Sequence, residues 1–428
     1  MCSANPSLGK LHSTVADFAT ELSDGLLPRT SAYGEIWLDK TMVAGEAVQD
    51  HEPLYGPYYL PRKFKIAIAV PPTNDVDVFC HDLGYIAVVD ENKQLLGYNV
   101  TIGGGMGVTH SMKTTYPRLA DVVGFITPEK GLEVAKAVML TQRDNGNRAN
   151  RKNARVKYTV DRMGIDAFKA EVEKRAGFKF EPARPYTFTK NVDQFGWQTG
   201  DDGRKHFTVF IENGRVQDEP GRPYRTGMRE IAKAHKGVFR LTANQHLIIS
   251  DINPGEDERV IADLLAKYKL DKIDFSGLRL SSAACVAFPT CGLAMAESER
   301  YLPVLIDKVE EMMEEAGLRN DSITMRMTGC PNGCARPWAA EVAFVGKAPG
   351  SYLMLLGGGY HGQRLNKIYR EAVGEQEILD ILRPMIKAYA LERLEGEHFG
   401  DFVIRKGIIT PTTAGKAFYD GMNPGLTA

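Results

Sequence analysis

Residues Tyr98–Gly107 read YNVTIGGGMG, an apolar strand that runs directly into three consecutive glycines. Far downstream, Ser351–Gly362 read SYLMLLGGGYHG, a second apolar strand that ends in the same way. Each is followed by a segment with helical spacing of its apolar residues, PEKGLEVAKAVMLTQR in one case and EQEILDILRPMIKAYALERL in the other. Recurrence of the same strand-and-glycine segment, each followed by a helix, is typical of an internal repeat.

The segments before the triple glycines correspond as well. KFKIAIAVPPTNDVD predicts an alternating strand that enters a Pro-Asn turn before GYIAVV, and ITMRMTGCPNGC predicts the same before EVAFVG. Triple glycines that merely end strands at bends are the alternative. Their position in two matching units favours two copies of a strand–turn–strand–GGG–helix unit, at roughly residues 60–145 and 320–390. Backbone without side chains would also let a large flat cofactor approach closely.

A smaller α+β module is expected between the repeats. HFTVFIENGRVQ predicts two strands joined by an Asn-Gly turn, and FRLTANQHLIISDI predicts one further strand. The helices TGMREIAKAHKG and DERVIADLLAKYK follow these segments, so two or three strands would have to bury them. The module therefore resembles half of a larger one. The chain is expected to be α+β, with domains at residues 1–195, 196–275 and 276–428.

Length and composition favour a cytoplasmic enzyme. A chain of 428 residues exceeds what one hydrophobic core serves, and 43% hydrophobic with 25% charged residues is ordinary for a globular protein. The net charge of -1 argues against nucleic acid or a membrane surface as partner. No apolar run approaches the ~18 residues of a membrane span, and MCSANPSLGKLHST lacks the layout of a secretory signal.

Four of the six cysteines form the pattern C-x5-C, 38 intervening residues, then C-x3-C. A structural zinc site is the obvious alternative, because zinc held by four thiolates is common. Zinc sites usually use pairs two to four residues apart in small folds that need the metal, whereas the first pair here is wide. A four-iron cluster tolerates wider spacing, so the pattern favours iron–sulfur while zinc stays open.

The polar segment TQRDNGNRANRKNARVKY, residues 141–158, carries six Lys or Arg against one acid. A solvated helix face is the ordinary interpretation of such a run. A short nucleic-acid patch and a basic face towards an anionic ligand are the two alternatives.

The chain resembles the sirohaem-containing sulfite and nitrite reductases in CVAFPTCGLAMAESER, RMTGCPNGCARPWAAEVAFVG, YLPRKFK and the triple-glycine strands. The resemblance runs from the first residues to GDFVIRKGIITP, and the cysteine pattern with TGCPNGC is a highly specific signature of that family. It implies two pseudo-symmetric sirohaem and iron–sulfur repeat domains plus a half ferredoxin-like module. It also favours the anionic-ligand interpretation of the basic segment.

The resemblance assigns roles to individual residues. The 4Fe–4S cluster would be ligated by Cys285, Cys291, Cys330 and Cys334. Cys334 would also bridge to the sirohaem iron as its axial ligand. Arg62, Gln245 and Asn332 match positions that hold the sirohaem or lie in the cluster-wrapping turn.

Lys63 and Lys65 match the family's two active-site lysines, which bind the sulfite anion and supply protons. Strand alternation would put both on the same face, as two cations that converge on one anion require. A solvated strand edge is the ordinary alternative for such lysines.

The resemblance implies an assimilatory sulfite reductase, an oxidoreductase that reduces sulfite to sulfide with six electrons for cysteine biosynthesis. Electrons would come from a flavoprotein partner with FAD, FMN and NADPH, because no G-x-G-x-x-G fingerprint follows a strand here. A sirohaem nitrite reductase, an iron–sulfur carrier without catalysis, and a zinc protein are the alternatives.

The chain departs from the family's pattern at its beginning. MCSANP matches an internal stretch of the family, whose upstream segment supplies further arginines to the sirohaem pocket and a twin of the half module. We therefore expect a fragment, or an N-terminally processed or mis-annotated chain, in which sirohaem retention and independent activity are in question.

Overall fold

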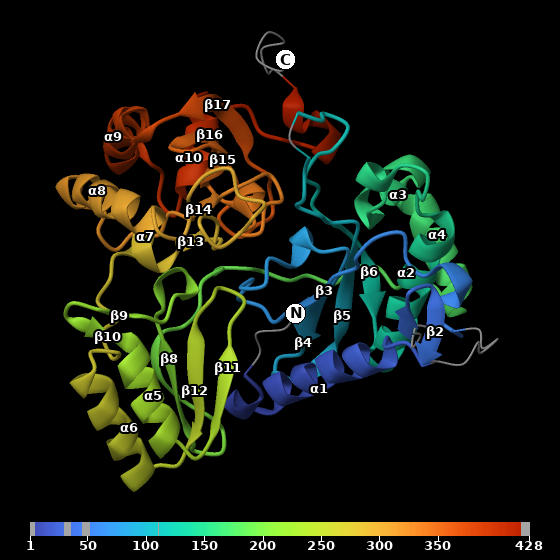
Figure 1. Cartoon of the computed structure of the whole chain (residues 1–428), viewed down its shortest axis with the longest axis horizontal. Helices are drawn as coiled ribbons and strands as arrows, with labels where there is room; N and C mark the ends of the chain where they lie inside the picture. The colour runs from blue at the N-terminus through green and yellow to red at the C-terminus, as the bar shows by residue number, and fades with distance from the viewer. Residues whose placement is uncertain (1–4, 30–35, 45–51, 110, 421–428) are drawn as a thin grey trace.

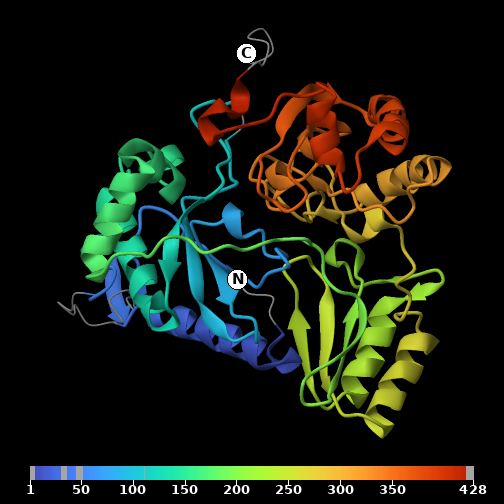
Figure 2. The same cartoon turned by 180° about the vertical axis from the view of Figure 1, so that it is seen from behind.

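The computed structural model describes residues 5–29, 36–44, 52–109 and 111–420. Figure 1 shows three parts, an N-terminal one in blue to green, a middle one in green to yellow, and a C-terminal one in orange to red. The view from behind in Figure 2 shows the same separation, with α1 running below the first part towards the second. The mixture of helices and separate sheets confirms the predicted α+β class.

The first part is built on a four-stranded sheet in the order β3-β4-β5-β6, in which β3 runs parallel to β4 and the other pairs are antiparallel. Its strands are β3 (Ile66–Ala69), β4 (Leu83–Val89), β5 (Leu95–Ile102) and β6 (Asp121–Ile126). Its helices are α1 (Lys10–Gly25), α2 (Gly131–Asn145), α3 (Val156–Met163) and α4 (Ile165–Ala176), and a hairpin of β1 (Ile36–Leu38) and β2 (Thr41–Ala44) lies beside them.

The last part repeats this topology. Its five-stranded sheet has the order β13-β14-β15-β16-β17, and β14 is parallel to β15 while the next two pairs are antiparallel. Its strands are β13 (Ala283–Ala284), β14 (Met325–Thr328), β15 (Val342–Ala348), β16 (Ser351–Leu356) and β17 (Lys367–Val373). Its helices are α7 (Gly277–Leu280), α8 (Leu302–Glu315), α9 (Glu375–Glu392) and α10 (Phe399–Arg405). The internal repeat predicted from the triple glycines is confirmed.

The strand before each Pro-Asn turn is shorter and more buried than the sequence suggested. β14 is buried along its whole length, and β3 is buried at all but its first residue, so neither presents alternating buried and exposed side chains. Parallel strands covered on both faces are buried throughout, and in β14 this includes the polar residues Arg326 and Thr328, 3% and 0% exposed.

The middle part has a four-stranded sheet in the order β11-β12-β8-β7, covered on one face by two helices (Figure 1). Its elements are β7 (Gly196–Thr199), β8 (Lys205–Val209), β9 (Asp218–Glu219), β10 (Arg222–Pro223), α5 (Tyr224–Ala234), β11 (Val238–Leu241), β12 (Leu247–Ile252) and α6 (Glu256–Lys267).

Two details of the middle part differ from prediction. The Asn-Gly segment is a 3-10 turn, Glu212–Gly214, rather than a hairpin, and the hairpin forms one step later between β9 and β10. The expected single strand over FRLTANQHLIISDI is itself a hairpin, β11 to β12. Its turn holds Gln245 at a φ of 74°. The domain boundaries after residues 195 and 275 stay predictions.

The two repeats share an apolar core around Trp338, in which Cys80, Met106 and Tyr158 of the first repeat pack with Leu355 of the second. Within the described residues, no helix has the length and apolar character to cross a membrane.

Candidate functional site

Parallel pairing brings the two cysteine segments together. β13 and β14 pair with Ala284 opposite Met327, so both strands end at the same edge of the sheet. The Cys285 N–H donates to the Met327 carbonyl across 3.2 Å, and the Gly329 N–H donates to the Cys285 sulfur across 3.2 Å. The C-x5-C and C-x3-C segments therefore meet although 38 residues separate them.

The other three cysteines lie on turns around this edge. Cys330 is buried, Cys291 is half-buried and Cys334 is exposed. Loss of hydration raises the pKa of the Cys330 thiol and also that of Cys334, whose sulfur the surrounding protein covers in part although the residue is exposed as a whole; nearby thiols raise both further. Gly333 has a φ of 67°, and a Cβ there would lie 2.7 Å from Nε1 of Trp338, so the turn between Cys330 and Cys334 requires glycine.

The four thiols are candidate ligands of a metal centre at this edge of the sheet. All four are free, yet no group of three or more His, Cys, Asp or Glu in the described part of the chain is spaced to hold one metal ion. Four thiolates with a backbone N–H already directed at one sulfur are the donor set of an iron–sulfur cluster. That these four thiols hold a 4Fe–4S cluster stays a prediction.

Lys63 and Lys65 lie near this site, but they precede the strand that was expected to carry them. Both precede β3, which begins at Ile66, so the assigned strand does not include them; Lys63 and Lys65 are exposed and Phe64 between them is half-buried, and their shared orientation stays a prediction. The Lys65 N–H donates to a carboxylate oxygen of Asp82 across 2.9 Å instead of a ladder partner. The positive charges of both lysines nevertheless lower the pKa of Cys334, against the larger effect of burial.

Asp82 holds a third cation at the same place. Its fully buried carboxylate accepts from Arg155 through Nη2 at 2.6 Å and Nε at 3.1 Å. Burial, then Lys63 and Arg155, lower the pKa of Lys65, while Asp82 and Cys334 oppose that shift. Arg155 belongs to the basic segment, so this end of the segment lies at the site rather than on a solvated face.

The glycine loop of the first repeat rests on the cysteine turn of the second. The Val108 N–H donates to the Pro331 carbonyl across 3.0 Å. Lys157 is fully buried and donates to the Gly107 carbonyl at 2.8 Å, to the Gly105 carbonyl at 3.2 Å, and to the Tyr116 carbonyl. The lysine thus fixes the loop that covers the turn.

The reverse contact also exists. The Asn74 side chain, in the Pro-Asn turn of the first repeat, donates to the His361 carbonyl in the GGGYHG loop across 2.8 Å. Each glycine loop therefore contacts the Pro-Asn turn of the other repeat.

Gln245 lies at the cysteine edge, and its side chain donates to the carbonyl of Ala284, the residue before Cys285, across 3.0 Å. Arg62 and Asn332 have exposed side chains. Contact of these three residues with a cofactor stays a prediction.

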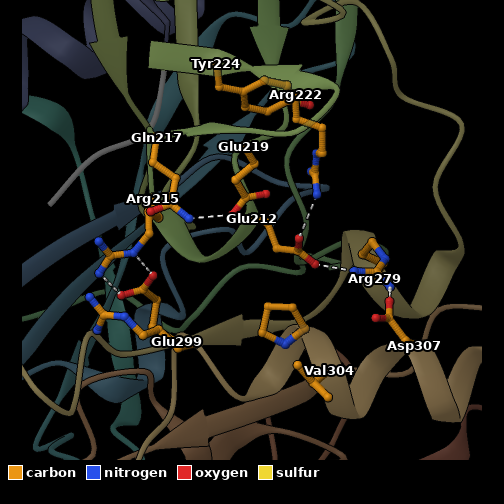
Figure 3. Close-up of a pocket in the computed structure, with 12 residues that line it drawn as sticks. Glu212, Arg215, Gln217, Glu219, Arg222, Tyr224, Arg279, Glu299, Val304 and Asp307 are labelled. Carbon is orange, nitrogen blue, oxygen red and sulfur yellow. Dashed lines mark hydrogen bonds and ion pairs between the residues drawn. The ribbon is translucent and has the colours of Figure 1, made fainter.

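A pocket of 400 Å3 lies between the middle part and the second repeat (Figure 3). Figure 3 shows Arg215 directed at the carboxylate of Glu299, with which it forms a two-point ion pair. The Glu299 N–H donates to the Cys285 carbonyl across 3.1 Å, and Asn213 donates to the Glu299 carbonyl at 3.1 Å. Glu299, which lines this pocket, therefore also holds the backbone of Cys285.

Sequence reasoning missed Asp82, Arg155 as an individual residue, and Lys157. Asp82 could have been predicted from one pattern. An acidic residue directly precedes the second strand of both repeats, Asp82 before β4 and Glu341 before β15. Glu341 accepts the Thr324 N–H across 2.8 Å, as Asp82 accepts that of Lys65.

Comparison with protein-family models gives two matches. The nitrite and sulphite reductase 4Fe-4S domain matches residues 20–180, and the nitrite/sulfite reductase ferredoxin-like half domain matches residues 198–267. The four clustered cysteines lie outside both ranges, so their assignment rests on the motif and the geometry.

Curated relatives cover nearly the whole chain. The sulfite reductase (NADPH) hemoprotein beta-component of Anoxybacillus flavithermus is 57% identical over 98% of this chain and 73% of its own length. That of Bacillus subtilis is 56% identical over 98% of this chain and 73% of its own length. The sulfite reductase (NADPH) subunit beta of Saccharomyces cerevisiae is 53% identical over 99% of this chain and 31% of its own length.

Among solved structures, the Mycobacterium tuberculosis NirA protein matches with a TM-score of 0.66 and 26% identity, over 82% of this chain and 64% of that one.

Proposed function

The chain belongs to the family of sulfite reductase hemoprotein beta-components, and we propose that it is the component that reduces sulfite to sulfide in an NADPH-dependent enzyme. One observation carries the proposal: the first repeat docks on the cysteine turn of the second through the Val108 N–H and the Pro331 carbonyl, 3.0 Å apart, and Lys63 and Lys65 of the first repeat lie near enough for their charges to act on Cys334. The proposed reducing centre and the proposed anion-binding residues would then lie side by side.

The cofactors we assign are a 4Fe–4S cluster and sirohaem. Cys285, Cys291, Cys330 and Cys334 would hold the cluster, and Cys334 would be the sulfur shared with the haem iron, consistent with its exposure. Arg62, Gln245 and Asn332 are proposed to contact the cofactors. When bound, the two groups would pass to the substrate, in successive steps, the six electrons that the external donor supplies.

Lys63 and Lys65 would bind the anion and deliver protons. Reduction of sulfite, SO3²⁻ + 6 e⁻ + 7 H⁺ → HS⁻ + 3 H2O, consumes protons at each cleavage of a sulfur–oxygen bond. A cation beside the substrate stabilises its charge, and a lysine with a lowered pKa gives up its proton more readily.

Electrons would reach the cluster from a flavoprotein partner that carries FAD and FMN and oxidises NADPH. We place the reaction in the cytoplasm, where reducing conditions keep cysteines free of disulfides. Co-purification with the flavoprotein and cell fractionation test these two proposals.

Two measurements test the function. Purified protein should show the visible bands of a haem, with iron and acid-labile sulfide in amounts that account for one cluster and one haem. With saturating donor, sulfite should be a better substrate than nitrite. A strong preference for nitrite would favour the sirohaem nitrite reductase alternative, and a brown protein without haem bands would favour an iron–sulfur carrier.

A further inference from the structure

One buried carboxylate of the first repeat holds both ends of the cysteine turn in the second. Asp77 is 1% exposed, and its Oδ2 accepts from Nη1 of Arg326 at 2.6 Å and from Nε of Arg336 at 2.5 Å. Arg326 lies on β14, four residues before Cys330, and Arg336 follows Cys334 by two residues. The carboxylate therefore links the strand that enters the turn to the segment that leaves it.

The two arginines are also linked to each other and to the middle part of the molecule. Arg326 donates through Nη1 to the Arg336 carbonyl across 3.2 Å, which ties the ends of the turn together directly. Arg336 donates through Nη2 to the Asn244 side chain at 2.9 Å and through Nη1 to the Ala243 carbonyl at 3.3 Å. Arg336 thus contacts all three parts of the chain.

The backbone at this contact follows the pseudo-symmetry of the repeats. Asp77 and Arg336 each precede a short 3-10 helix, Val78–Cys80 and Pro337–Ala339, and each has a left-handed φ, 47° and 54°. The two repeats therefore present equivalent positions to each other with opposite charges. Only the second repeat has cysteines in the adjoining turn.

The charges are shielded from solvent, so they act strongly on their surroundings. The side chains of Arg326 and Arg336 are 4% and 13% exposed. Burial would raise the pKa of Asp77, but the two guanidinium groups outweigh it and lower that pKa, so the carboxylate is ionised. Charges in a low-dielectric interior shift the reduction potential of a nearby metal cluster.

We propose that Asp77, Arg326 and Arg336 form a positioning cluster that fixes the Cys330–Cys334 turn and sets the electrostatic environment of the metal cluster bound there. The electrostatic role rests on the proposed 4Fe–4S site. The fixing of the turn concerns the protein alone and is testable without any cofactor.

The first experiment measures the midpoint potential of the cluster by redox titration followed by electron paramagnetic resonance. Asp77→Asn removes one negative charge and should shift the potential to a more positive value. Arg326→Gln removes one positive charge and should shift it to a more negative value. Structural damage alone gives no reason for shifts of opposite sign, so unchanged potentials or shifts of the same sign would overturn the electrostatic role.

Asp161→Asn is the matched control. Its carboxylate accepts from the Tyr116 hydroxyl at 2.7 Å and from Nε of Arg118 at 2.8 Å, and these contacts lie within the first repeat. This variant should keep the wild-type potential.

The second experiment uses metal-free protein and follows alkylation of Cys330 by iodoacetamide with peptide mass spectrometry. Cys330 is 7% exposed, so its reaction is slow while the turn is held. Asp77→Asn and Arg326→Gln should each accelerate it several-fold, whereas Asp161→Asn should not. Wild-type rates in both turn variants would overturn the positioning role. A wild-type protein that binds no cluster would instead refute the proposed function and the electrostatic role of the three residues. The alkylation rates would still decide whether these residues fix the Cys330–Cys334 turn.

Discussion

Substitution of Asp82 should change both the stability of the fold and the pH dependence of sulfite turnover, and a control variant can distinguish the two effects. The buried carboxylate pairs with Arg155 through two hydrogen bonds and accepts the Lys65 N–H. Asp82→Asn keeps the shape of the side chain and one acceptor oxygen but removes the charge. The variant therefore perturbs the support of Lys65 without touching either lysine side chain.

The expected loss of stability follows from burial. Removal of one partner from a buried ion pair costs about 3–5 kcal/mol, because the other charge stays behind without compensation. Since asparagine retains one acceptor and Arg155 has a 12% exposed side chain, we expect the low end, about 3 kcal/mol. Loss of the negative charge also lowers the pKa of Lys65 further, because Asp82 is one of two groups that raise it.

The assay is the pH dependence of sulfite turnover, together with urea unfolding. A lower Lys65 pKa means that the proton is lost at lower pH, so the alkaline limb of the profile should move to lower pH. Glu341→Gln is the control from the other repeat: Glu341 is fully buried and accepts the N–H groups of Thr324 and Gly400, each at 2.8 Å. It should destabilise the fold and leave the alkaline limb in place.

Two outcomes would contradict this reasoning. An alkaline limb unchanged in Asp82→Asn would mean that Lys65 is not the group that titrates in turnover. An equal shift in both variants would mean that loss of stability alone moves the profile.

Four further predictions concern single residues. Lys63→Ala should retain iron, sulfide and haem bands but lose turnover about 10²-fold or more, measured as kcat with saturating donor; unchanged kcat would refute its role. Cys330→Ser should lose most of the cluster iron, as elemental analysis would show. Burial lowers the pKa of His246 from 6.5 to about 4, so the unfolded chain takes up the proton first. Stability present above pH 6.5 is therefore lost as the pH falls towards 4, by about 3 kcal/mol, and urea unfolding of His246→Gln should lack that loss. Gly104→Ala would place a Cβ 2.2 Å from a backbone carbonyl oxygen and should destabilise by about 2 kcal/mol or more in thermal unfolding, unlike Gly292→Ala, where the space is open.

Features that depend on residues close together in the sequence could be predicted from it. The triple glycines and the strands before them identified the repeat, and C-x5-C with C-x3-C predicted that four cysteines act together, because both patterns are read from spacing along the chain. The parallel pairing of β13 with β14 then places the cysteines together, as the pattern required.

Partners far apart along the chain could not be predicted. Asp82 and Arg155 are 73 residues apart, and Asp77 lies 249 and 259 residues from its two arginines, so no local pattern links them. Lys63 and Lys65 were identified from the family motif, but the Asp82 carboxylate that binds the Lys65 N–H could not be foreseen from that motif. Glycine-free left-handed turns such as the one at Gln245 also carry little signal, which is why its hairpin was expected to be one strand.

The crossed contacts between glycine loops and Pro-Asn turns bear on the order in which the protein matures. Asn74 and His361 are 287 residues apart, and contacts of such long sequence separation form slowly because a long loop must close first. The turn with Cys330 and Cys334 is therefore completed only after both repeats have been synthesised and have docked. A cofactor bound at this turn would therefore meet two docked repeats rather than an isolated segment of the second repeat.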